Sequence, residues 1–207
     1  MITENITEEN SFYNKTALSL KIYRGFVMEF YDVIKYRTSV RDYSDKTVEE
    51  DKITYILECA RFAPSWMNKQ SVRFIVIKNK ETISLVAKTS LINRWLKTAP
   101  VLIIACADPT ISRIHNNMDY YLVDVSIALE HLILAATDIG LGTCWTNEFN
   151  EEEVKKLLEI PKRIRVVALT PLGYPVGTKG IVDSITATLM KGKKRKTLDE
   201  IVHHEHW

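Results

Sequence analysis

The sequence predicts one main domain in which short strands and helices alternate around a long, buried helix. Two β-branched runs, 72–77 and 101–107, fit buried strands, and helical stretches separate them. Residues 119–139 are apolar at three- and four-residue steps, which is the period of one helix face. The chain has 207 residues, 46% of them hydrophobic, and is therefore long enough to bury a sizeable core.

The central helix has the strongest pattern. Its expected buried face consists of Tyr121, Leu122, Val125, Ala128, Leu129, Leu132, Ile133 and Ala136. More apolar residues flank this face, so we expect protein to surround the helix nearly all round. Gly140 follows the last periodic residue, where a helix often ends in a left-handed turn, and a β-prone run, 143–146, comes next.

The first 27 residues differ in composition from the rest. They show little periodicity and are rich in Asn, Thr, Glu and Lys, so we expect a loosely held extension at 1–27 and a single domain at 28–207. Met28 is an alternative start of translation, and the intact mass of the native protein would distinguish the two.

The remaining elements follow from local signals. Phe30, Val33 and Ile34 form a short helical face that ends at Arg37, and Thr47 with Glu50 has the spacing of a capping box. The further expected elements are a helix from that box through Ala63, helical stretches containing Ile83, Leu85, Val86, Leu91, Trp95 and Leu96, a loop at 108–118, a helix at 151–158 and a strand at 166–169.

Composition excludes several classes of protein. Lys and Arg exceed Asp and Glu by only 28 to 26, which argues against nucleic acid or an anionic membrane as the main partner. No uninterrupted apolar run reaches about 18 residues and no secretory leader is visible, so we expect a cytoplasmic protein that does not span a membrane. Cys59, Cys106 and Cys144 lie far apart in apolar runs and are expected to be buried thiols.

Arg37 and Arg41 are a candidate anion site. Two guanidinium groups with the hydroxyls of Thr38 and Ser39 between them, at the end of a helix, can neutralise and hydrogen-bond a phosphate. Taken alone, the same spacing is more often a solvated helix end.

Two further segments lie where the chain is expected to change direction, and each could meet a ligand. In the turn from Pro64 to Gln70, Asn68 and Gln70 offer both donors and acceptors, although such residues usually satisfy local backbone groups. In the segment 140–149, two glycines allow close approach of the main chain, although the same residues also end a helix and enter a strand.

The sequence resembles the nitroreductase family of FMN-dependent oxidoreductases across residues 28–202. The resemblance lies in these segments and in two further ones, Leu172-Gly173-Tyr174-Pro175 and 194–202, which occur in the same order as in the family. The resemblance implies that FMN binds to residues of all these motifs except 172–175. The implied cofactor-binding residues are Arg37, Thr38, Ser39, Arg41, Pro64, Ser65, Trp66, Asn68, Gln70, Trp145, Thr146, Asn147, Lys193 and Arg195.

The resemblance also implies roles within that set. The FMN phosphate would be held by Arg37, Ser39, Arg41 and a C-terminal basic residue, for which Arg195 is the first choice and Lys193 the second. The Pro64–Gln70 turn would lie near the flavin. The main-chain N–H groups of Asn147 and Glu148 would face flavin N5, and no side chain would be catalytic. The family often has glycine at the position of Glu148 and Pro-Trp at the position of Ser71-Val72.

The implied fold is α+β, with a small, mainly antiparallel sheet flanked by helices, a long central helix and an intertwined homodimer that binds FMN at its interface. The implied activity is ping-pong transfer of hydride from NADH or NADPH, a transient co-substrate, to a small-molecule acceptor such as a nitroaromatic or a quinone. Reductive dehalogenation, enoyl reduction, flavin cleavage and a non-enzymatic flavin carrier remain as alternatives.

Some residues have weaker assignments. Arg94, Trp95, Tyr120 and Tyr121 could contact substrate, although packing is the commoner role, and His115 fits a surface residue better than a catalytic acid. The cluster of His203, His204 and His206 lacks a carboxylate or cysteine that would complete a site, so no metal is expected.

Overall fold

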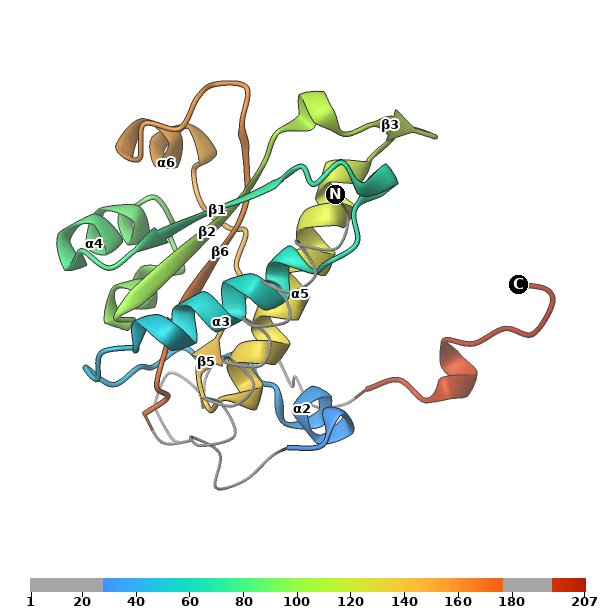
Figure 1. Ribbon diagram of the computed structural model, residues 1–207, viewed down its shortest axis with the longest axis horizontal. Helices are drawn as coiled ribbons and strands as arrows, with labels where there is room; N and C mark the ends of the chain where they lie inside the picture. Colours follow the sequence, from blue (N-terminus) through green and yellow to red (C-terminus); the bar gives the residue numbers. More distant parts are fainter. Residues whose placement is uncertain (1–27, 177–194) are drawn as a thin grey trace, which may run out of the picture. The chain divides into compact units, whose positions relative to one another are not determined.

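The computed structural model describes residues 28–176 and 195–207 (Figure 1). The chain divides into one compact unit that ends at Pro175 and a second that begins at Val176. The expectations for residues 1–27 and for Lys193 lie outside the described residues.

The first unit contains a four-stranded sheet in the order β1-β2-β6-β5, and every neighbouring pair is antiparallel. The strands are β1 (Val72–Ile77), β2 (Val101–Ala107), β5 (Gly142–Thr143) and β6 (Arg165–Gly173). The α+β class with an antiparallel sheet is therefore confirmed. The strands expected at 72–77 and 101–107 have the predicted bounds, whereas β6 extends beyond the expected 166–169.

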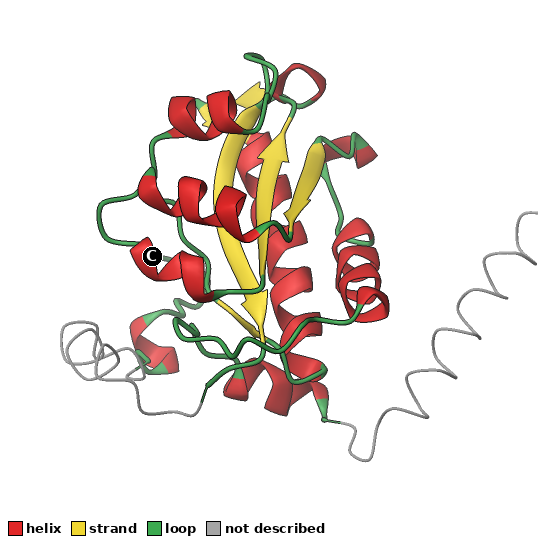
Figure 2. Ribbon diagram, turned by 90° about the vertical axis from the view of Figure 1, so that its left-hand side faces the viewer, coloured by secondary structure: helices red, strands yellow, loops and turns green. Residues whose placement is uncertain are grey.

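Helices cover both faces of the sheet (Figures 1 and 2). They are α3 (Glu50–Arg61), α4 (Lys80–Lys88), α5 (Tyr120–Asp138) and α6 (Glu151–Leu157), while α2 (Phe30–Tyr36) packs against α5. One core joins α3 and α5 to the side of β2 that carries Val101, Ile103, Ala105 and Ala107. A second core joins α4 and α6 to Leu102, Ile104 and Cys106 on the opposite side. All seven residues of β2 are buried because both faces are covered.

The predicted face of α5 is buried except at Leu122, which is 43% exposed. The outer side of the helix is exposed at Leu122, Val123 and Glu130. Contrary to the expectation, a single chain therefore does not surround this helix on all sides. Gly140 has φ +77°, in agreement with the expected left-handed end.

Among the described residues, α5 is the one helix long and apolar enough to cross a membrane by length and composition. This finding departs from the expectation that no segment reaches that length. Half of the relevant window is buried in the protein, as in the central helix of a globular domain.

Two local expectations are wrong. No capping box forms at Thr47, because α3 has Glu49 as its N-cap and no side-chain cap bond. The Glu49 carboxylate instead accepts a 2.6 Å hydrogen bond from the Tyr174 hydroxyl, beyond the end of β6. Residues 108–118 are not only loop, since β3 (Ile114–His115) and β4 (Met118–Asp119) form a hairpin. Asn116 and Asn117 between them both have positive φ, as a tight hairpin turn requires.

Candidate functional site

The Arg37–Arg41 segment lies directly against β5, which follows the central helix. The Val40 N–H donates a 2.8 Å hydrogen bond to the Thr143 carbonyl, and Ser39 forms a parallel bridge with Thr143. A Cβ on Gly142 would lie 2.8 Å from Val40 Cγ2, so this approach requires glycine. The fold thereby brings together two motifs that are about a hundred residues apart in the sequence.

Arg37, Ser39 and Arg41 all act on the Cys144 thiol. Burial raises the pKa of the Cys144 thiol, while the Arg41 charge, a hydrogen bond with Ser39 and the Arg37 charge act in the opposite direction. The Arg41 guanidinium also lies 5.8 Å from the centre of the Trp95 ring. The segment therefore supplies two positive charges and a hydroxyl that act on the same residue. Since its pKa is raised, Cys144 remains a thiol at neutral pH, as a buried packing residue should.

The loop after β5 is anchored on two sides. Thr146 and Leu169 exchange backbone hydrogen bonds of 3.0 and 2.8 Å, so the Thr146 N–H already has an acceptor. The Asn93 amide donates to Thr146 Oγ1 at 2.6 Å and to the Glu148 carbonyl at 3.0 Å. The Ser90 hydroxyl donates to the Glu148 carboxylate. Glu148 is thus held by its side chain as well as by its carbonyl.

The main-chain N–H group of Trp145 and two others in this loop have no acceptor among the described residues. The two others belong to Asn147 and Glu148, and all three residues are exposed. Main-chain donors held by neighbouring hydrogen bonds can bind a ligand without reorganising. The Thr146 N–H is occupied by Leu169, whereas the N–H groups of Asn147 and Glu148 remain available to a ligand within the described part of the chain.

The turn from Pro64 to Gln70 has an unusual backbone. Met67, Asn68 and Gln70 have φ of 45°, 54° and 51°, a region that non-glycine residues enter at a cost of about 1–3 kcal/mol each. The Gln70 N–H donates to Ser65 Oγ at 2.9 Å, and the Gln70 amide donates to Asn68 Oδ1 at 3.2 Å. The turn is thus closed on itself, with Asn68 and Gln70 exposed.

Sequence reasoning missed Asp124, which fastens this turn to α5. Its Oδ1 accepts a 2.8 Å hydrogen bond from the Trp66 N–H, and its Oδ2 accepts a 2.9 Å bond from the Ser71 hydroxyl. The residue is only 2% exposed. A carboxylate directly before Val125, on the buried face of an apolar helix, was the signal that could have identified it.

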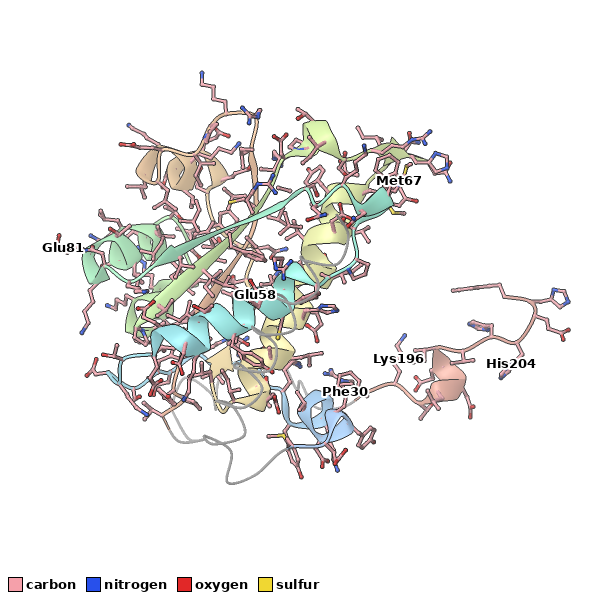
Figure 3. The ribbon with its side chains drawn as sticks, in the orientation of Figure 1. Phe30, Glu58, Met67, Glu81, Lys196 and His204 are labelled. Carbon is pink, nitrogen blue, oxygen red and sulfur yellow. The ribbon has the colours of Figure 1, made fainter. Side chains whose placement is uncertain are left out.

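One chain does not bring the turn and the basic segment together. The turn is attached to α5 at Asp124, near its start, whereas the Arg37–Arg41 segment contacts β5, after its end. The helix from Asp124 to Asp138 spans about 20 Å. Figure 3 shows the same separation, with Met67 of the turn and Phe30 of α2 far apart along α5.

The other candidate residues have mixed environments. Tyr121 is buried and its hydroxyl accepts a 3.2 Å bond from Arg165, so it packs. Arg94 and His115 are exposed, while Trp95 and Tyr120 are half-buried. The exposure of His115 agrees with the expected surface position.

The second unit carries Arg195 on its exposed surface. A short 3-10 helix, Leu198–Glu200, follows and begins with a capping box between Thr197 and Glu200. The His203 and Trp207 rings lie 4.6 Å apart. Within the described ranges, no three histidine, cysteine or acidic side chains are placed to hold a metal.

Comparison with known proteins gives consistent matches. The model of the nitroreductase family matches residues 34–91 and 83–174. The crystal structure of a nitroreductase family protein from Clostridium novyi NT is 39% identical, covers 76% of this chain and 91% of its own, and has a TM-score of 0.71. A Bacillus subtilis protein named as an NAD(P)H FMN reductase is 30% identical over 164 residues, 70% of this chain and 66% of its own. The iodotyrosine deiodinase of Thermotoga neapolitana is 27% identical over 170 residues, 70% of this chain and 88% of its own.

Proposed function

The chain belongs to the nitroreductase family, and from that premise we propose that it is an FMN-dependent oxidoreductase. When bound, FMN would supply the redox chemistry, taking hydride from NADH or NADPH at N5 and passing it to a nitroaromatic, a quinone or a similar acceptor. The similarity to an FMN reductase supports the cofactor and the nicotinamide donor.

One observation carries the proposal: the fold packs the Arg37–Arg41 segment against Gly142 and Thr143. A basic segment and a loop with unpaired main-chain donors thereby adjoin the same short strand. This combination suits a ligand with an anionic tail at one end and a polar ring at the other, because each end needs a different kind of donor.

The residues present fit the phosphate of FMN. The Arg37 and Arg41 guanidinium groups would neutralise it, and the hydroxyls of Thr38 and Ser39 would donate hydrogen bonds. Arg195 and Lys193 are proposed as further basic partners from the C-terminal part of the chain. Arg37, Thr38, Ser39 and Arg41 are all exposed or half-buried, so a ligand can reach them.

The flavin ring would be held mainly by the main chain. Trp145, Thr146, Asn147 and Glu148 would border it, with the N–H groups of Asn147 and Glu148 aimed at the ring. No side chain is assigned a catalytic role. The protein orients the ring and stabilises the negative charge that grows during reduction, which fixed N–H dipoles do without moving.

The turn residues Pro64, Ser65, Trp66, Asn68 and Gln70 would come from a second copy of the chain, because within one chain they lie at the far end of α5. Exposed apolar side chains support such a homodimer. Phe30, Tyr31 and Ile34 on α2 are 69%, 73% and 48% exposed, and α5 adds Leu122 and Val123. An apolar surface of this kind is typical of a subunit interface.

The absorbance spectrum of the purified protein tests the cofactor, and anaerobic mixing with NADH or NADPH tests the reaction. We expect flavin bands that bleach with a nicotinamide donor and return when a nitroaromatic or a quinone is added. A protein that binds no FMN would overturn the proposal. Bands that neither donor bleaches would instead favour a flavin carrier or another electron donor.

Reductive dehalogenation is the second candidate, favoured by the similarity to an iodotyrosine deiodinase. The reduced protein would then be reoxidised by an iodinated phenol with release of iodide. Parallel reoxidation rates with an iodophenol, a nitroaromatic and a quinone would rank the candidates, with an enoyl substrate included as a further acceptor.

A further inference from the structure

Asp124 is a deeply buried acidic group to which the proposed flavin site gives no role. It lies in the second turn of α5, where its neighbours on the buried face, Tyr121, Val125 and Ala128, are apolar. Burying a carboxylate is costly unless hydrogen bonds compensate. Here both oxygens accept bonds, from the Trp66 N–H at 2.8 Å and the Ser71 hydroxyl at 2.9 Å.

The two donors flank the turn that contains the left-handed residues. Trp66 precedes Met67 and Asn68, and Ser71 follows Gln70, so one carboxylate fastens both ends of the turn to α5. Methionine and glutamine rarely adopt positive φ, and such positions persist only where the surroundings hold them. The bonds to Asp124 and the internal bond from Gln70 to Ser65 provide that restraint.

This restraint acts on groups that are free to meet a ligand. Asn68 and Gln70 are exposed, and the bond between their side chains fixes their relative orientation. A ligand that binds to a turn already held in this conformation loses less conformational freedom, and affinity rises accordingly.

We propose that Asp124 is a positioning residue for the cofactor, which acts by holding the Pro64–Gln70 turn in its binding conformation. The inference rests on the proposed function, since it takes flavin to be the ligand of Asn68 and Gln70. Asp124 itself is only 2% exposed and would act through the turn rather than by touching the ligand.

The test compares Asp124→Asn and Asp124→Ala with the wild type by FMN titration of the apoprotein. Asparagine keeps one acceptor oxygen, so we expect a roughly tenfold rise in the Kd of FMN, and alanine should raise it roughly a hundredfold. The visible bands and the midpoint potential of bound flavin should also shift, because the contacts to the ring change. The matched control is Ile133→Val, which shortens a buried side chain on the same helix without touching the turn.

The outcomes separate this inference from the function on which it rests. If wild-type protein binds no FMN, the proposed function fails before any variant is made. If it binds FMN, and the Asp124 variants lose thermal stability as Ile133→Val does yet keep wild-type affinity and spectrum, the positioning role is refuted. Should both variants fail to fold, Ser71→Ala removes one donor alone, and wild-type affinity in that variant would refute the role equally. Sedimentation must show that each variant keeps the oligomeric state of the wild type.

Discussion

The side chain of Val40 packs onto the α-carbon of Gly142, with 2.8 Å between Val40 Cγ2 and the position that a Cβ would take. This contact presses the Arg37–Arg41 segment against β5. Because the nearest atoms belong to a branched side chain next to the backbone, Val40 cannot swing away easily.

We therefore expect Gly142→Ala to displace the basic segment. Overpacking of this kind costs about 1–3 kcal/mol of stability, and FMN retention should fall with it. Thermal unfolding and the flavin content of purified protein provide the measurements. Gly140→Ala is the control, since Gly140 has φ +77° but no atom within 4 Å of its added Cβ. That variant should lose stability and keep its flavin, and equal flavin loss in both would contradict the explanation.

Arg37→Ala and Arg41→Ala should weaken FMN binding more than folding. A charge-assisted hydrogen bond contributes about 1.5–3 kcal/mol, so each variant should lose roughly tenfold or more in affinity. The control is Arg61→Ala, because Arg61 forms an exposed ion pair with Glu58. This variant should bind FMN as the wild type does. A double variant of Arg37 and Arg41 that keeps its full complement of yellow cofactor would rule out this phosphate site.

Asn93→Ala should loosen the loop that presents Asn147 and Glu148. The Asn93 amide donates to Thr146 and to the Glu148 carbonyl from a buried position, so its loss should cost about 1–3 kcal/mol of stability. Anaerobic stopped-flow should also show slower reduction by NADH or NADPH.

The matched variant for Asn93 is Asn79→Ala. Asn79 caps α4 through a 2.8 Å bond from the Thr82 N–H, and loss of a cap costs about 1 kcal/mol. This variant should be less stable and react at the wild-type rate. A rate in Asn93→Ala equal to that of Asn79→Ala would mean that Asn93 supports only folding.

Stability should depend on pH through Glu49. The hydrogen bond from the Tyr174 hydroxyl is the main cause that lowers the pKa of Glu49 from 4.5 to about 2. The ionised carboxylate therefore stabilises the fold at pH values above 4.5, and this contribution is lost as the pH falls toward 2.

The comparison of wild type with Tyr174→Phe checks this dependence. Without the hydroxyl, the pKa of Glu49 should return toward its ordinary value, and unfolding should show a smaller loss of stability between pH 4.5 and pH 2. Parallel curves for the two proteins would assign the acid sensitivity to other carboxylates.

Predictions that depended on continuous burial were accurate, whereas a prediction that depended on local spacing alone was not. The strands at 72–77 and 101–107 were predictable because continuous burial on two faces demands an unbroken apolar run. The capping box at Thr47 was wrong because α3 begins only at Glu50, whose carboxylate pairs with the distant Lys78, and local spacing cannot reveal such a partner.

The sequence by itself determined the elements, the types of residue at each motif and the family to which the chain belongs, since these depend on local periodicity and residue order. Only the tertiary structure decided that Val40 lies on Gly142, that Asp124 holds the turn, and that the turn and the basic segment stand at opposite ends of α5. Those relationships depend on which distant segments the two cores bring into contact, and a packing contact leaves no mark on the spacing of residues along the chain.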